Sequence, residues 1–250
     1  MEAVARLEIG LNQAYRQAFF ELHRDLPREG PGDPDDVSWA ADVANVPKGA
    51  NICDAACGPG ADIAALLSAA PEGHVTALDK VEHFVDQAKL THAGDPRVTV
   101  ETGDMTFLTG PYDFIWCAGA LYFLGVSEAL TLWRKALARG GAIAFSQVCW
   151  FSDTPSAHAL AGWAEYPDMV HERDLLAQID AAGYETLGQR RVSDAAWEAY
   201  YRPLDARIEK LEASASDVLK QVLQEARDEA ALWRAERQSF GYLLCIVRPK

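Results

Sequence analysis

Two kinds of hydrophobic spacing alternate along this chain. Apolar residues recur every three or four positions between residues 4 and 22, which predicts an amphipathic helix there. From residue 49 onward, short apolar runs alternate with segments of helical spacing, as is typical of a parallel sheet covered by helices on both faces. The expected strands are residues 50–55, 74–79, 98–102, 112–118, 141–147, 186–191 and 240–247.

Capping residues mark where several helices begin and end. Asp33 has the character of an N-cap with Pro34 at the first helical position, and this helix is expected to reach Ala44. Further helices are expected near residues 61–70, 82–91 and 127–139, the last of them capped by Gly140-Gly141 just before a strand.

The C-terminal part is expected to be mostly helical, over residues 169–182 and then 194–238. Breaks in the second stretch are expected near Pro203 and at Ser214–Ser216. Its apolar face would pack on its own domain or form a dimer contact, so the protein is expected to be a monomer or a homodimer.

Together these elements predict an α/β fold with a Rossmann-like open, mostly parallel seven-stranded sheet. Helices would cover both faces, and added N- and C-terminal helices would lie over the sheet edge. Residues 1–34 would form an N-terminal helix and cap segment, and residues 35–150 a ligand-binding core. Residues 151–250 would add capping helices and the last two strands to the same compact domain.

The net charge of −14 narrows the choice of partners. Such a surface repels phosphate, so neither a nucleic-acid nor a membrane partner is expected, although a cationic ligand is favoured. The N-terminus lacks the pattern of a signal peptide, and the five cysteines lie mostly in apolar stretches. These features predict a cytoplasmic protein with reduced thiols, and the scattered histidines predict no metal site.

Residues suited to ligand binding follow the expected strands at the points where they end. The first strand ends at Asp54, and Gly58 and Gly60 in the following turn would let the backbone approach a ligand closely. Asp79 ends the next strand, where an acidic side chain can accept hydrogen bonds from both hydroxyls of a ribose. Because the carboxyl ends of parallel strands meet at one sheet edge, these residues predict a single ligand site.

The next two strand ends extend this pattern. Asp104 and Met105 follow the third strand, and Ala118 and Gly119 follow the fourth. The segments Asp54-x-x-Cys57-Gly58-x-Gly60, Asp79, Gly103-Asp104-Met105 and Gly140-Gly141 resemble, in order, the motifs of class I S-adenosylmethionine-dependent methyltransferases. Over residues 35–150 the chain is similar to the type-11 methyltransferase domain group of that family. One departure is Ala56, where the family usually has glycine.

The resemblance implies S-adenosylmethionine as cofactor and assigns roles to the strand-end residues. Asp79 would hold the ribose diol, and Lys80 or Val81 would flank the adenine. Asp104 would accept a hydrogen bond from the adenine amine, and Met105 would lie against the adenine ring. The implied cofactor-binding residues are Asp54, Ala55, Ala56, Gly58, Gly60, Asp79, Lys80, Asp104, Met105, Ala118 and Gly119.

Segments outside the core further resemble bacterial small-molecule methyltransferases of unassigned substrate. We therefore expect methyl transfer to a small-molecule acceptor by in-line displacement, which demands alignment and exclusion of water but no obligatory catalytic residue. The acceptor pocket is expected to be aromatic and to include Trp150, Phe151, Tyr166, Trp197 and Tyr201. Tyr201 is the candidate catalytic residue, expected to project over the methyl donor as a lid.

Two other functions are compatible with the same fold. A nicotinamide dinucleotide enzyme would carry a third glycine where Ile63 stands, and it would have no counterpart of Asp104-Met105. A non-catalytic protein that binds S-adenosylmethionine or a partner would keep the whole pattern, and turnover of an acceptor would distinguish it.

Overall fold

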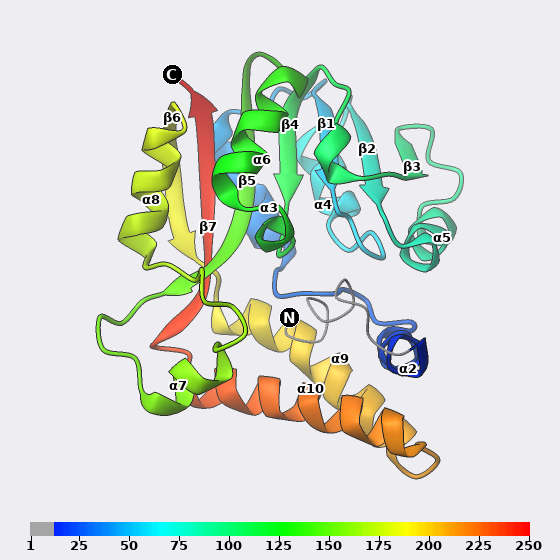
Figure 1. Ribbon diagram of the computed structural model, residues 1–250. Coiled ribbons are helices and arrows are strands. Elements are labelled where there is room, and N and C mark those ends of the chain that lie inside the picture. The colour runs from blue at the N-terminus through cyan, green and yellow to red at the C-terminus, as the bar shows by residue number, and fades with distance from the viewer. Residues whose placement is uncertain (1–12) are drawn as a thin grey trace.

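A seven-stranded sheet forms the centre of the protein, in a computed structural model that describes residues 13–250 (Figure 1). The strand order is β3-β2-β1-β4-β5-β7-β6; β1 to β5 are parallel, and β7 runs antiparallel to both of its neighbours. The mostly parallel seven-stranded sheet predicted from the sequence is thereby confirmed. The strands are β1 (Asn51–Ala55), β2 (His74–Asp79), β3 (Val98–Thr102), β4 (Tyr112–Cys117), β5 (Leu137–Trp150), β6 (Tyr184–Arg191) and β7 (Phe240–Pro249).

Helices cover both faces of the sheet, and each face has its own hydrophobic core. One cluster joins the sheet to α3 (Pro34–Ala44), α4 (Ile63–Ala69) and α5 (Glu82–Thr91). The other joins it to α6 (Val126–Trp133) and α8 (Glu172–Ala181). Short 3-10 turns η1 (Met105–Phe107), η2 (Leu121–Phe123) and η3 (Arg134–Ala136) complete the connections.

Four further helices lie across the edge to which the parallel strands point (Figure 1). They are α2 (Gln13–His23), α7 (Ala157–Gly162), α9 (Asp194–Glu212) and α10 (Asp217–Glu236), and α10 packs against the other three. Residues of this layer line the space next to the strand ends. The part of the first predicted helix that precedes Gln13 lies outside the described residues.

The structure confirms the capping residue predicted for the start of α3. Asp33 is the N-cap of α3, and its Oδ1 accepts hydrogen bonds from the backbone N–H groups of Asp35 at 2.8 Å and Asp36 at 3.0 Å. Asn45 ends that helix in the left-handed conformation.

Gly140-Gly141 does not cap a helix as expected, because α6 ends earlier and both glycines lie inside β5. Leu137 pairs with Tyr112 of β4, but Ala142 pairs with Phe114, so β5 carries extra residues between these two points. Gly140 absorbs this irregularity with a φ of 81°, a conformation that other residues adopt at a cost.

The break expected near Pro203 is also wrong, since α9 continues through this residue and the two long helices separate only at residues 213–216. An interior proline costs a helix about 3 kcal/mol. Buried side chains precede and follow it on one face, and their packing outweighs that cost: Trp197, Tyr200, Tyr201, Leu204 and Ile208.

The alanine that departs from the family pattern lies in a left-handed turn. Ala56 follows β1 with a φ of 62°, and Gly58 has a φ of 53° in the same loop. A left-handed conformation costs an L-residue about 1–2 kcal/mol. The loop therefore keeps the shape of a glycine turn against a local conformational preference of Ala56.

Replacing this alanine with glycine should stabilise the protein. Relief of the left-handed strain exceeds the added chain entropy of glycine, so Ala56→Gly should raise the free energy of unfolding by roughly 0.5–1 kcal/mol in urea denaturation. Ala55→Gly is the matched control. Ala55 is a buried strand residue, so the loss of its methyl group and the added chain entropy of glycine should lower the free energy of unfolding. Destabilisation by both substitutions would contradict the strained conformation of Ala56.

Candidate functional site

A cleft of about 990 Å³ opens where β1, β2, β3 and β4 end. All but two of the predicted cofactor-binding residues line it: Asp54, Ala56, Gly58, Asp79, Lys80, Asp104, Met105, Ala118 and Gly119. The four strand ends thus converge on one space, as the sequence predicted.

Ala55 and Gly60 do not line the cleft. Ala55 is the last residue of β1 and is fully buried between the strand's neighbours. Gly60 faces helix α5, and a Cβ added to it would lie 3.0 Å from the Cβ of Ala88 and 3.0 Å from the Cδ1 of Ile63. Gly60 therefore serves helix packing in this structure.

Asp79 ties the glycine loop to the end of β2. Its Oδ2 accepts a 2.8 Å hydrogen bond from the Gly58 N–H, and its Oδ1 accepts one of 2.9 Å from the Val81 N–H. Burial raises the pKa of this carboxyl, and the backbone hydrogen bonds oppose that rise. Each oxygen retains a lone pair, so Asp79 can hold the loop and still accept hydrogen bonds from a ligand.

Asp54 lies deeper in the cleft, and its charge is poorly compensated. Its Oδ2 is buried with no hydrogen-bond partner among the described residues. Burial raises the pKa of its carboxyl well above the usual range, and the neighbouring charges of Asp62 and Asp79 add to the effect. Among the described residues, the charge of Arg28 opposes this rise. Asp54 is therefore an unsatisfied hydrogen-bond acceptor that a cationic ligand group would satisfy.

Arg28 and Glu29 are cleft residues that sequence reasoning missed. They belong to the connection between α2 and α3, which passes across the strand ends (Figure 1). Arg28 donates to Asp62 Oδ1 at 3.2 Å and to the Gly30 carbonyl at 2.6 Å. The signal in the sequence is a charged pair beside a glycine- and proline-rich turn, within the segment expected only to form part of the N-terminal cap.

The ends of β3 and η1 form the opposite side of the cleft. Asp104 Oδ1 accepts hydrogen bonds from the Thr106 N–H at 2.9 Å and the Thr106 hydroxyl at 2.7 Å, and these bonds lower the pKa of the Asp104 carboxyl. The Met105 carbonyl accepts a 2.7 Å hydrogen bond from Trp133 Nε1, which holds the Met105 backbone at the cleft.

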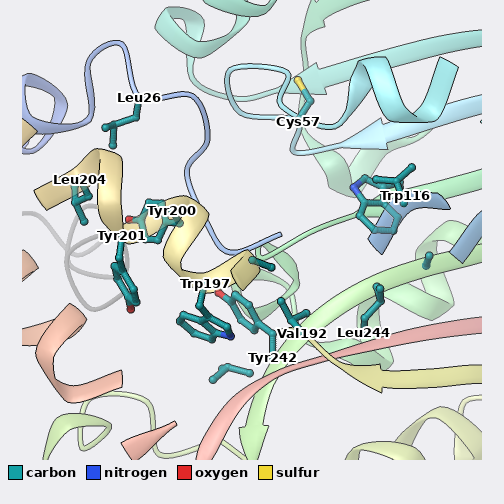
Figure 2. Close-up of a cluster of buried hydrophobic side chains, with 14 of the residues drawn as sticks. Leu26, Cys57, Trp116, Val192, Trp197, Tyr200, Tyr201, Leu204, Tyr242 and Leu244 are labelled. Carbon is teal, nitrogen blue, oxygen red and sulfur yellow. The ribbon is translucent and has the colours of Figure 1, made fainter. Parts of the chain in front are cut away.

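A second cavity, of about 320 Å³, adjoins the cleft under the helical layer. Aromatic rings predominate in its wall, and the predicted pocket residues Tyr166, Trp197 and Tyr201 are among them. Tyr242 is a wall residue that the sequence did not single out, and its ring stacks on Trp197 at 5.1 Å (Figure 2). The residues shared by the two spaces are Phe19, Glu29, Gly30, Pro31, Gly119 and Tyr122.

Trp150 and Phe151 do not line this cavity, contrary to expectation. They lie at and just after the end of β5, where alternation turns them to opposite faces. Trp150 packs edge-on against Phe240 at 6.1 Å, and the guanidinium of Arg191 lies 4.0 Å from the ring centre of Phe151. Both rings therefore stabilise the sheet.

Tyr201 lines the cavity but not the cleft, so the lid expected over the donor site is not the observed arrangement. Its ring is buried against Trp197 and Trp233, at 5.8 and 5.6 Å, and points away from the glycine loop (Figure 2). The Tyr201 hydroxyl donates to Glu229 Oε1 at 3.3 Å. These contacts place Tyr201 in a packed wall.

Two classes of feature are absent from residues 13–250. Within this range no group of three His, Cys, Asp or Glu side chains could hold a metal ion. None of the helices described there combines the length and the apolar character needed to cross a membrane.

The buried carboxylate of Asp54 should make stability depend on pH. Because the folded protein holds this proton more tightly than the unfolded chain, the free energy of unfolding falls as the pH rises above about 3.9, the pKa of an unfolded aspartate. Asp54→Asn removes this loss, so the variant should gain on the order of 1 kcal/mol or more over the ligand-free wild type between pH 5 and pH 8.

Asp95→Asn provides the control for this measurement. Hydrogen bonds from Arg97 hold the pKa of Asp95 at about 2, so its contribution is constant over the same pH range. Urea denaturation at several pH values compares the three proteins. Parallel curves for wild type and Asp54→Asn would show that Asp54 titrates normally.

Comparison with known proteins supports the assignment of this fold. Residues 52–141 match a family model described as a methyltransferase domain. An S-adenosylmethionine-dependent methyltransferase from Geobacter sulfurreducens, solved with S-adenosylhomocysteine, is 21% identical with a TM-score of 0.80, over 94% of this chain and 98% of that chain. A counterpart from Thiobacillus denitrificans, also solved with S-adenosylhomocysteine, is 20% identical with a TM-score of 0.76, over 96% and 99%.

A curated relative adds a sequence match without a function. It is an uncharacterized 37.1 kDa protein in transposon Tn4556 of Streptomyces fradiae, 29% identical over 137 residues, which are 53% of this chain and 37% of that protein. Residues 52–141 are thus similar to the methyltransferase domain family, and the chain shares its fold with the two S-adenosylmethionine-dependent methyltransferases.

Proposed function

We propose that this protein transfers a methyl group from S-adenosylmethionine to a small-molecule acceptor by in-line displacement. The observation that carries the proposal is the junction of the two spaces: the strand-end cleft and the aromatic cavity share Glu29, Gly119 and Tyr122. A donor in the cleft and an acceptor in the cavity would meet there, which is the alignment that methyl transfer requires.

The residues of the cleft fit the donor at both of its ends. The unpartnered Oδ2 of Asp54 suits the ammonium of the methionyl group, and Arg28 suits its carboxylate. Asp79 would accept hydrogen bonds from the ribose hydroxyls, and Asp104 and Met105 would hold the adenine. The donor would supply a methyl group bound to a positively charged sulfur, which leaves as a neutral thioether.

Gly119 would lie beside the reacting atoms. It follows β4 with a φ of 68°, and its N–H donates to Ser146 Oγ at 2.8 Å. With no side chain, Gly119 would leave the passage between cleft and cavity open, and the surrounding rings would exclude water once an acceptor is bound.

The size and enclosure of the cavity favour a small acceptor. Its volume of about 320 Å³ falls in the range of small-molecule sites, and helices cover it. The net charge of −14 disfavours a nucleic-acid acceptor. A cytoplasmic location and a monomeric or homodimeric state are part of the same proposal.

Cofactor identity is tested by isothermal titration. S-adenosylhomocysteine should bind with micromolar or tighter affinity, because the cleft offers partners for each of its polar groups, whereas NAD should not bind. The pyrophosphate of NAD would need a glycine at the helix start, where Ile63 is fully buried. NAD binding without S-adenosylhomocysteine binding would contradict the proposal.

Asp79→Ala should weaken S-adenosylhomocysteine binding by at least about tenfold. The substitution removes an ionised acceptor for the ribose, whose hydrogen bonds are worth about 1.5–3 kcal/mol each, and releases the glycine loop. Asp86→Ala is the control, since Asp86 is an exposed residue of α5 outside the cleft. Equal affinity in both folded variants would place the ribose elsewhere.

A further inference from the structure

We propose that the methyl acceptor is a small molecule with a basic nitrogen attached to an apolar or aromatic body, and that Glu29 receives this nitrogen. The inference rests on the proposed function, because it names the substrate class of the same site. Three independent features carry it: the charge of the cavity wall, its aromatic faces and the position of Glu29.

The charged side chains of the wall are predominantly acidic. Among the described lining residues, the acids are Glu29, Glu165, Glu225, Asp228 and Glu229. The described part of the wall contains no lysine or arginine, and its basic side chains are His23 and His158. The side chain of His158 is 66% exposed and lies 3.7 Å from Glu236, an acid outside the wall. Such a wall favours a cationic ligand over a neutral or anionic one.

The remaining surface suits a cation with an apolar body. The wall contains the rings of Phe19, Tyr122, Trp163, Tyr166, Trp197, Tyr200, Tyr201, Phe240 and Tyr242. Aromatic faces attract cations through their quadrupole, and most strongly where water is excluded. They also bury the apolar part of the same ligand, so the wall favours an amine with a hydrophobic substituent.

Glu29 is the acid that lines both the cavity and the cleft. His23 Nδ1 lies 2.6 Å from its Oε2, and the His23 ring stacks on Phe19 at 4.0 Å, which fixes this carboxylate. The other oxygen, Oε1, is buried and has no partner among the described residues. This oxygen is a buried hydrogen-bond acceptor without a partner, at the point where the methyl donor and its substrate would meet. It is therefore suited to bind the reacting nitrogen.

Glu29 can also take the proton that this nitrogen must lose. Burial raises the pKa of its carboxyl, and His23 opposes the rise. An ammonium group would pass one proton to Oε1, and the freed lone pair would form the new C–N bond. The C–S bond breaks with its electron pair on sulfur, so the methylated ammonium, a protonated Glu29 and a neutral thioether result.

Other groups of the wall are poorly suited to this role. Burial raises the pKa of the Tyr200, Tyr201 and Tyr242 hydroxyls, so these phenols remain neutral and cannot act as bases near neutral pH. Asp54 has an unpartnered oxygen too, but it lines only the cleft. Glu29 is therefore the candidate that combines position, burial and an open acceptor.

Matched ligands test the charge preference in the wild-type protein saturated with S-adenosylhomocysteine. The probes are tryptamine and 2-phenylethylamine, their alcohols tryptophol and 2-phenylethanol, and the acids indole-3-propionate and 3-phenylpropionate. Isothermal titration calorimetry measures the binding of all six probes. The amines should bind at least about tenfold more tightly than the alcohols, and the acids should bind least.

Glu29→Gln should lower amine affinity by about 10–100-fold, the loss expected for a charge-assisted hydrogen bond, and leave alcohol affinity nearly unchanged. Glu21→Gln is the matched control, since Glu21 is an exposed acid of α2 that lines neither the cavity nor the cleft. Its amine affinity should change by less than about threefold. Equal effects of the two substitutions would reduce Glu29 to one of several surface charges and overturn its assignment.

The pH dependence of amine binding tests whether Glu29 acts through its charge, because a purely structural role would produce no such dependence. The groups that influence Glu29 are His23, Asp79 and His83. Because burial raises the pKa of Glu29, lowering the pH should begin to weaken amine binding while the pH is still above 4.5, the usual pKa of a glutamate. Glu29→Gln should abolish this dependence. An identical pH dependence in the variant would overturn the assignment.

Turnover separates this inference from the proposed function. With S-adenosylmethionine present, mass spectrometry should find N-methylated amine, and Glu29→Gln should lower kcat by about 10²-fold or more. If S-adenosylhomocysteine binds but the alcohols or acids bind as tightly as the amines, the substrate class is wrong and the methyltransferase function stands. Loss of S-adenosylhomocysteine binding would contradict the proposed function itself.

Discussion

The two hydrogen bonds that the Asp79 carboxylate accepts from the backbone hold the site together. They fasten the loop after β1 to the end of β2, so the left-handed turn at Ala56 and Gly58 keeps a fixed position against the sheet. The parallel sheet brings four strand ends to one edge, and this carboxylate joins two of them. The position of a bound donor therefore depends on a side chain that also braces the backbone.

Uncompensated acidity is the second property of the site. Burial raises the pKa of Asp54, Asp79 and Glu29, and Asp54 and Glu29 each have an oxygen without a partner among the described residues. Such groups lower the stability of the ligand-free protein. Cationic groups of a donor and an acceptor would satisfy them, so the same desolvation that costs stability would favour binding, a common compromise at functional sites.

Local patterns predicted the parts of the structure that depend on local physics. Alternating periodicity located the strands, and the Asp33 cap marked the start of α3, because a cap is satisfied by its own helix. Gly140-Gly141 was misassigned because its conformation follows from the register of β5 on β4, which the sequence of one strand does not contain. Pro203 was misassigned because packing on both sides of it keeps α9 intact.

The same distinction applies to the site. The residues at strand ends were predictable because topology alone brings them together. Arg28 and Glu29 were not, since the connection from α2 reaches the cleft only through tertiary contacts such as the one between Arg28 and Asp62. Aromatic composition predicted the nature of the cavity and three of its rings, Tyr166, Trp197 and Tyr201. It also led to the inclusion of Trp150 and Phe151 and the omission of Tyr242, because which rings line the cavity depends on tertiary packing.

The most direct measurement is a crystal structure of the protein with S-adenosylhomocysteine. The ribose should contact Asp79, and the sulfur should lie next to Gly119 and face the aromatic cavity beside Glu29. A ligand bound elsewhere, or one whose sulfur points away from this cavity, would contradict the account.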